Sequence, residues 1–123
     1  MSSSALQRHL TSNGDSSVAL DTRIPALIAK LEDLQCASAT VAQIVQCGPA
    51  AIPFLADALI YGKRRSIPHS RCSLVDALRL LGASEVLLEY LKTSSPNEDL
   101  EIRFAEDIVI GAAARAIKLD FSV

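Results

Sequence analysis

The sequence contains no tryptophan, and its aromatic residues amount to only 4% of the chain. Five glycines and five prolines are too few for the many turns of a β-sandwich. The apolar half of the chain therefore consists mainly of alanine, leucine, isoleucine and valine, which let helices stack closely. This composition indicates an all-helical chain. The length of 123 residues indicates one domain, or a fragment of a larger one.

Other absences narrow the class of protein. No run of 18 apolar residues occurs, so the sequence predicts no membrane span. The formal net charge of −2 provides no global positive field that would attract nucleic acid. Residues 1–18 are polar and rich in serine, and they lack the pattern of a signal peptide. We expect them to form a disordered tail before a domain at residues 19–123.

The three cysteines form no CxxC motif, and three thiols cannot all pair with one another. Cys36 and Cys47 lie eleven residues apart, which along one helix is about 16 Å and too far for a disulfide. We therefore expect reduced thiols that pack as small hydrophobic side chains. A reducing, cytoplasmic location follows from that expectation.

An internal repeat is the clearest feature that is present. Residues 24–31 (IPALIAKL) and 52–59 (IPFLADAL) share a pattern at an offset of 28, and 84–91 (SEVLLEYL) is a weaker copy at a further offset of 32. Residues 40–48 (TVAQIVQCG) and 74–82 (LVDALRLLG) form a second series at an offset of 34. A helical pattern with a period near 30 residues is the signature of a solenoid.

The ends of the repeats carry helix signals. Apolar residues at helical spacing run from residue 24 to Leu34 and predict one buried stripe. Pro25 and Pro53 are expected in the first turn of their helices, where a missing amide donor costs nothing. Gly48 and Gly82 are expected to end the second helix of their repeats in the left-handed conformation.

These signals predict six helices, over residues 23–34, 37–47, 49–61, 69–81, 83–92 and 98–118. Loops are predicted at 62–68 and 93–97, and the repeats at 23–47, 49–81 and 83–118. Because the connections are short, neighbouring helices are expected to pack antiparallel. The predicted fold is all-α, a short right-handed α–α superhelix of three helix pairs.

The pattern Arg71-x-x-Leu74-x-x-Ala77-Leu78-x-x-Leu81-Gly82 resembles the second helix of HEAT-like repeats, the type also found in phycobilisome lyase subunits. Residues 48–55 (GPAAIPFL) resemble the opening of the family's first helix, and Asp99-x-x-Ile102-Arg103 resembles its Asp-x-x-Val-Arg entry to a second helix. The likeness covers about residues 24–118, but Ala37 stands where arginine is usual and the third repeat lacks the closing Leu-Gly. The resemblance implies a HEAT/armadillo-like solenoid, in a family of scaffolds, inhibitors, accessory lyases and a few enzymes.

No grouping of residues predicts catalysis, a metal site or a cofactor. His9 has no metal ligand three or four residues along the chain, and His69 has only Cys72 there, which is too few ligands for a metal site. No glycine-rich phosphate loop occurs. No spacing supports a Ser-His-Asp or Cys-His arrangement. The paired His-Glu motifs of HEAT-like di-iron hydroxylases are absent, as is the tryptophan on which HEAT-like DNA glycosylases rely. We therefore expect a chain that is not an enzyme.

Positive charge is concentrated around one predicted loop, in Lys63, Arg64, Arg65, His69 and Arg71. One interpretation is a patch that binds an anion or an acidic protein partner. The alternative is that the loop is merely solvated and that Arg71 caps a helix or reaches the next repeat. Nucleic acid is disfavoured, because one short cluster without interleaved aromatic residues neutralises few phosphates.

The last predicted helix is apolar around most of its circumference. Its expected core stripe is Ile102, Ala105, Val109, Ala112 and Ala116, with further apolar surface from Ala113 and Ile110. The predicted interface residues are Phe104, Ile108, Gly111 and Ile117. A terminal repeat normally needs a polar outer face. Either this helix packs against a second copy or another partner, or it is embedded in its own stack.

The sequence therefore favours a non-catalytic protein-interaction module or scaffold, with a partner that it does not identify. Besides the basic loop, its predicted binding residues are Gln43, Asp76 and Arg79, on the concave face of the second helices. Two alternatives stay open. One is an accessory, lyase-like subunit of an enzyme, which needs a reactive cysteine or a polar pocket. The other is anion or nucleic-acid binding through residues 63–71.

Overall fold

The computed structural model describes the backbone of residues 12–94 and 99–121, and the side chains of 19–94 and 99–118. All regular secondary structure in these ranges is helical, and no strand occurs in them. The helices are α2 (Ser12–Lys30), α3 (Ala37–Gln46), η1, a 3-10 segment (Gly48–Ala51), α4 (Ile52–Tyr61), α5 (His69–Leu80), α6 (Ser84–Thr93) and α7 (Leu100–Phe121). The prediction of an all-α chain is confirmed for this part of the protein. Residues 1–11 of the expected tail and 95–97 of the expected loop lie outside it.

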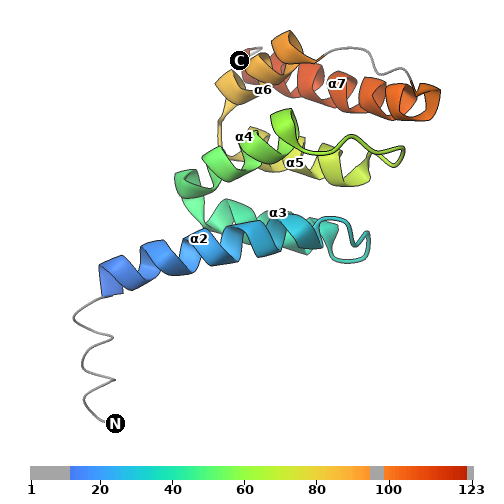
Figure 1. Ribbon diagram of the computed structural model, residues 1–123. Coiled ribbons are helices and arrows are strands. Elements are labelled where there is room, and N and C mark those ends of the chain that lie inside the picture. Colours follow the sequence, from blue (N-terminus) through green and yellow to red (C-terminus); the bar gives the residue numbers. More distant parts are fainter. Residues whose placement is uncertain (1–11, 95–98, 122–123) are drawn as a thin grey trace.

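The helices associate as three successive pairs, α2 with α3, α4 with α5, and α6 with α7 (Figure 1). The second helix of each pair contacts the second helix of the next, since α3 packs on α5 and α5 packs on α7. The first helices make the matching contacts of α2 with α4 and of α4 with α6. The chain thus has a row of first helices and a row of second helices, and α7 lies at the end of the second row.

Two glycines end second helices as the sequence predicts. Gly48 has φ +79° and Gly82 has φ +74°, both in the left-handed region that side chains with a Cβ disfavour. After α5, the Gly82 amide donates to the Arg79 carbonyl at 3.0 Å and the Ala83 amide donates to the Leu78 carbonyl at 2.9 Å. These two bonds form a Schellman motif, which satisfies carbonyls at the helix end and turns the chain into α6.

The first helix differs from its prediction. Helix α2 begins at Ser12, eleven residues before the expected start at residue 23, so it includes part of the segment expected to be a tail. Pro25 therefore lies inside the helix, and its expected place in the first turn is wrong. Pro53 does lie at the start of α4, as expected. The stripe also ends early, because a turn after Lys30 leaves Leu34 70% exposed.

The predicted loop at 62–68 is confirmed, since α4 ends at Tyr61 and α5 begins at His69. The predicted helix at 49–61 is divided into η1 and α4. The predicted helix at 98–118 begins at Leu100 and reaches Phe121.

One hydrophobic core joins all three pairs. Its largest fully buried side chains come from the six α-helices and from the turn after α2, and they include Ile24, Leu31, Ile44, Leu55, Leu59, Leu78, Leu87, Tyr90 and Val109. Within α7, Ala105, Val109 and Ala116 are buried as expected, with Ile102 and Ala112 half-buried. Ala113 is also fully buried, which corrects its expected place on the outer surface. The buried side of α7 faces α5 and α6, so its opposite side is left to solvent.

Candidate interaction surface

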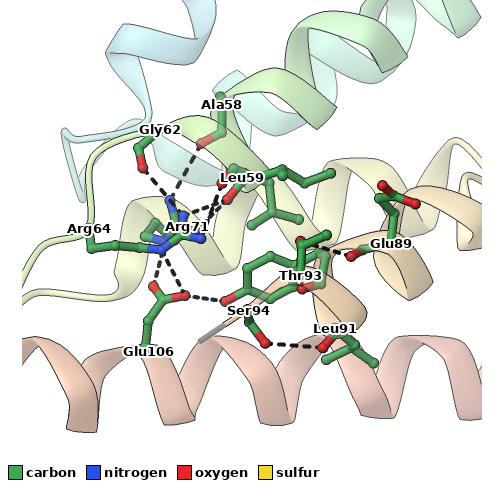
Figure 2. A network of polar contacts seen from close by, with 12 residues as sticks. Ala58, Leu59, Gly62, Arg64, Arg71, Glu89, Leu91, Thr93, Ser94 and Glu106 are labelled. Carbon is green, nitrogen blue, oxygen red and sulfur yellow. Dashed lines mark hydrogen bonds and ion pairs between the residues drawn. The ribbon is translucent and has the colours of Figure 1, made fainter. Parts of the chain in front are cut away.

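Arg71 lies inside the protein and is only 3% exposed. Its Nε donates to Glu106 Oε1 at 2.8 Å, and its Nη2 donates to the Leu59 carbonyl at 2.6 Å. A longer bond of 3.4 Å joins Nη1 to the Ala58 carbonyl (Figure 2). Arg71 thus caps the end of α4 and reaches the third helix pair, as the alternative interpretation of this residue predicts. It is not part of an exposed basic patch.

Arg64 makes a second cap at the same helix end. Its Nη1 donates to the Leu59 carbonyl at 2.8 Å, and its Nη2 donates to the Ile60 carbonyl at 3.1 Å. Its Nε lies 3.4 Å from Glu106 Oε2. The last carbonyls of a helix have no partner inside the helix and carry partial negative charge. Both guanidinium groups therefore bind where the backbone of α4 presents acceptors.

Tyr90 completes this group, and its hydroxyl donates to Glu106 Oε2. The guanidinium carbons of Arg64 and Arg71 each lie 5.8 Å from the centre of the Tyr90 ring, within cation–π range. Burial raises the pKa of Tyr90 above its usual value, and the bond to Glu106 raises it further. We call Arg64, Arg71, Tyr90 and Glu106 the Glu106 cluster. It connects α4, α5, α6 and α7 through one carboxylate.

Two of the three remaining basic residues around the loop also contact other parts of the protein. Arg65 forms an ion pair with Glu32, next to the turn after α2. His69 Nε2 lies 3.0 Å from the Glu32 carbonyl, while its Nδ1 is buried without a hydrogen-bond partner among the described residues. Lys63 is exposed and forms no ion pair within that part of the chain. The sequence predicted one patch here, but the structure divides it into an inner cluster and an outer contact to Glu32.

A shallow hollow remains beside the loop, lined mainly by polar residues: Glu32, Lys63, Arg64, Arg65, Ser66, Ile67, His69 and Ser70. Because Glu32 lies among its cations, the hollow has mixed charge. This weakens its suitability for an anion.

Asp76 and Arg79 lie three residues apart on α5, and they form an ion pair of 3.6 Å. Both lie at the surface, so the pair contributes little to stability. Gln43, on α3, is half-buried. Asp76 and Arg79 also line the groove between α5 and α7, together with Ala112 and Arg115. Their predicted role in binding a partner stays a prediction.

Among the described helices, α7 carries the largest number of exposed large apolar side chains. Leu100, Phe104 and Ile108 recur every four residues and are 61%, 65% and 53% exposed. Side chains at this spacing lie along one side of a helix. Gly111 is half-buried on the same side, and a Cβ there would meet only the Arg115 guanidinium, at 3.4 Å. Ile117 instead packs against the core, so it does not belong to this surface.

All three cysteines are free and half-buried. Burial raises the pKa of Cys72, and the Asp76 carboxylate raises it further, against smaller opposing effects of Arg115 and Arg71. An activated thiol has the opposite shift, because its thiolate is stabilised. Among the described side chains, those of residues 19–94 and 99–118, no group of three or more His, Cys, Asp or Glu could hold a metal ion.

No single described helix is long and apolar enough to cross a membrane. Only α3 taken together with Gly48–Tyr61 reaches the required length and composition, and these two segments meet at a bend of 118°.

Comparisons of the chain with protein-family models, with curated proteins and with solved structures found no match. The likeness to HEAT-like repeats therefore depends on the residues quoted above.

Proposed function

We propose that this chain is a non-catalytic protein-interaction module, and that it binds its partner through the exposed side of α7. The observation that carries the proposal is the apolar stripe of Leu100, Phe104 and Ile108, which is exposed on a helix whose other side is packed into the core. Burying large apolar side chains is the main favourable contribution to protein association. An aromatic side chain at the centre of such a stripe is a typical binding hot spot.

The arrangement of helices supports a second part of the proposal. We place the chain among HEAT-like solenoids, because each pair contacts the next through matching helices and left-handed glycines follow both α3 and α5. In such a stack, the row of second helices offers a continuous binding face. Asp76 and Arg79 on α5 then form a polar rim next to α7, and Gln43 lies farther along the same row, on α3. The free, half-buried cysteines suit a reducing compartment, and the proposed location is the cytoplasm.

The two alternative functions have weaker support. A lyase-like accessory role needs a reactive thiol or a polar pocket, and the pKa of Cys72 is shifted in the unreactive direction. Anion or nucleic-acid binding needs free cations, whereas Arg64 and Arg71 bind Glu106 and helix carbonyls, and Arg65 binds Glu32. We therefore propose that the partner binds at α7 and that Arg64 and Arg71 stabilise the fold.

A photo-crosslinking amino acid at position 104 tests the proposal in cells that naturally contain the protein. We expect discrete covalent adducts of defined mass at this position. The matched control is position 89 on α6, since Glu89 is also exposed but lies outside the apolar stripe. If position 104 gives no more adducts than position 89, the proposed function is wrong.

A further inference from the structure

A heptad-like series of residues follows the exposed side of α7. Glu101, Phe104, Ile108, Gly111 and Arg115 are spaced by 3, 4, 3 and 4 residues, so they lie along one line of the helix. We call these five residues the α7 seam. All of them are exposed except Gly111, which is half-buried and has no side chain. The seam is about 21 Å long, enough to pack against another helix over four turns.

The charges of the seam are placed symmetrically. Glu101 and Arg115 each lie seven residues from Ile108, one toward either end of the helix. In an antiparallel pair of α7 helices that cross at Ile108, each Glu101 faces Arg115 of the second copy. In a parallel pair, the two Glu101 side chains would face each other, and so would the two Arg115 side chains. Both contacts would be repulsive. The charges therefore select the antiparallel arrangement.

The sizes of the seam residues agree with the same arrangement. An antiparallel pair centred on Ile108 places Phe104 beside Gly111 of the second copy, because the two positions are four and three residues from the centre. A Cβ at Gly111 would meet only Arg115, so the space above this residue is closed by one flexible side chain. The bulky ring thus faces the one seam position without a side chain. The two Ile108 side chains meet on the axis.

We infer that the partner at α7 is a second copy of this chain, bound as an antiparallel, two-fold symmetric dimer centred on Ile108. The inference rests on the proposed function, and it specifies the partner of the same surface. A two-fold axis makes each contact occur twice, so every seam residue contributes on both sides of the interface. The apolar centre of Phe104 and Ile108 supplies affinity, and the Glu101–Arg115 pairs fix the direction of the two helices.

Sedimentation equilibrium of the full chain over a range of micromolar concentrations tests this inference. We expect the wild type to dimerise and Glu101→Arg to weaken the dimer at least about tenfold, since two attractive pairs become repulsive. Arg115→Glu should have the same effect. The double variant Glu101→Arg/Arg115→Glu should recover the affinity to within about threefold, because the pairs are restored with reversed sign.

A parallel dimer would respond differently, because each single reversal would leave like charges facing each other as before. A wild type that stays monomeric, or a dimer that the single reversals do not weaken, would overturn the inference. Circular dichroism of the variants excludes unfolding as the cause, since both charges are exposed.

Crosslinking at position 104 separates this inference from the proposed function. Adducts with twice the mass of the chain support both. Adducts with a different protein, together with a monomeric wild type, overturn the dimer and leave the proposed function in place. An absence of adducts at this position overturns both.

Discussion

Arg71 and Glu106 are separated by 35 residues in the chain, and their side chains form a buried ion pair of 2.8 Å between α5 and α7. A carboxylate removed from water is stable only when partners satisfy both oxygens. Here Arg71 occupies one oxygen, while Tyr90 and Arg64 occupy the other. The second and third helix pairs are therefore joined by a specific polar contact as well as by apolar packing.

Replacing Glu106 with alanine should destabilise the fold strongly. The substitution leaves Arg71 buried without its counter-charge, which typically costs about 3–5 kcal/mol. Glu106→Gln keeps the shape of the side chain and one acceptor oxygen. It should therefore lower the free energy of unfolding by less, about 1–3 kcal/mol. Urea unfolding followed by circular dichroism measures both values.

Glu89→Ala is the matched control for that series, because Glu89 is exposed on α6 and its carboxylate lies outside the cluster. Its effect should stay within about 0.5 kcal/mol. Equal losses for Glu106→Ala and Glu89→Ala would show that the cluster does not contribute to stability.

Tyr90 should make the protein sensitive to alkali. Its pKa is raised in the folded state from an ordinary value of 10.0, so the fold favours the protonated hydroxyl. The resulting stability is complete below about pH 10 and is lost as the pH rises toward the folded-state pKa.

Tyr90→Phe removes this ionisation. The wild type should exceed the variant in free energy of unfolding by about 1–2 kcal/mol near pH 8, and this difference should shrink above pH 10. Lysine titration affects both proteins alike, so the difference isolates Tyr90. A difference that is constant up to about pH 11 would contradict the raised pKa.

Gly82 should resist substitution because of its backbone and not because of crowding. It has φ +74°, and a Cβ there would meet nothing within 4 Å. Gly82→Ala should therefore cost about 1 kcal/mol, the strain of a left-handed residue with a Cβ.

Gly111→Ala is the opposite case, since Gly111 lies inside α7 and an added Cβ would meet only the flexible Arg115 side chain, at an ordinary contact distance of 3.4 Å. There the added methyl should stabilise the helix by up to about 1 kcal/mol in the monomer. Thermal unfolding at low protein concentration compares the two variants. A similar sign for both changes would refute the assigned conformations.

Cys72 should react slowly with alkylating reagents at neutral pH. A variant with Cys36→Ser and Cys47→Ser leaves it as the only thiol. The rate of reaction with iodoacetamide should reach half its maximum above pH 9.0, because burial and Asp76 raise the pKa of this thiol. A midpoint below that value would revive the lyase-like alternative.

Much of the fold could be predicted from the sequence, because local signals carry it. Gly48 and Gly82 end second helices as their positions predict, and Pro53 lies in the first turn of α4. Pro25 does not indicate the start of α2, because it lies inside this helix and not in its first turn. Leu20, four residues before Ile24 and packed against the core, was the signal that the helix continues toward the N-terminus.

The Glu106 cluster could not be predicted in the same way. Glu106 belongs to an acidic stretch that suggests a solvated surface, and its burial depends on how α7 is rotated against α5 and α6. A local signal did exist, since Glu106 falls between Ala105 and Val109 on the buried side of the helix. Its pairing with Arg71 is a long-range contact. No spacing in the sequence encodes that contact.

The most direct test of α7 as a binding surface is to measure the free energy of unfolding of the monomer after Phe104 and Ile108 of the apolar stripe have been replaced. Phe104→Ser/Ile108→Ser should change the free energy of unfolding by no more than about 0.5 kcal/mol at a protein concentration too low for association. The same variant should no longer associate. A loss of more than about 2 kcal/mol would contradict the proposal, because it would mean that both side chains are embedded in the protein's own core.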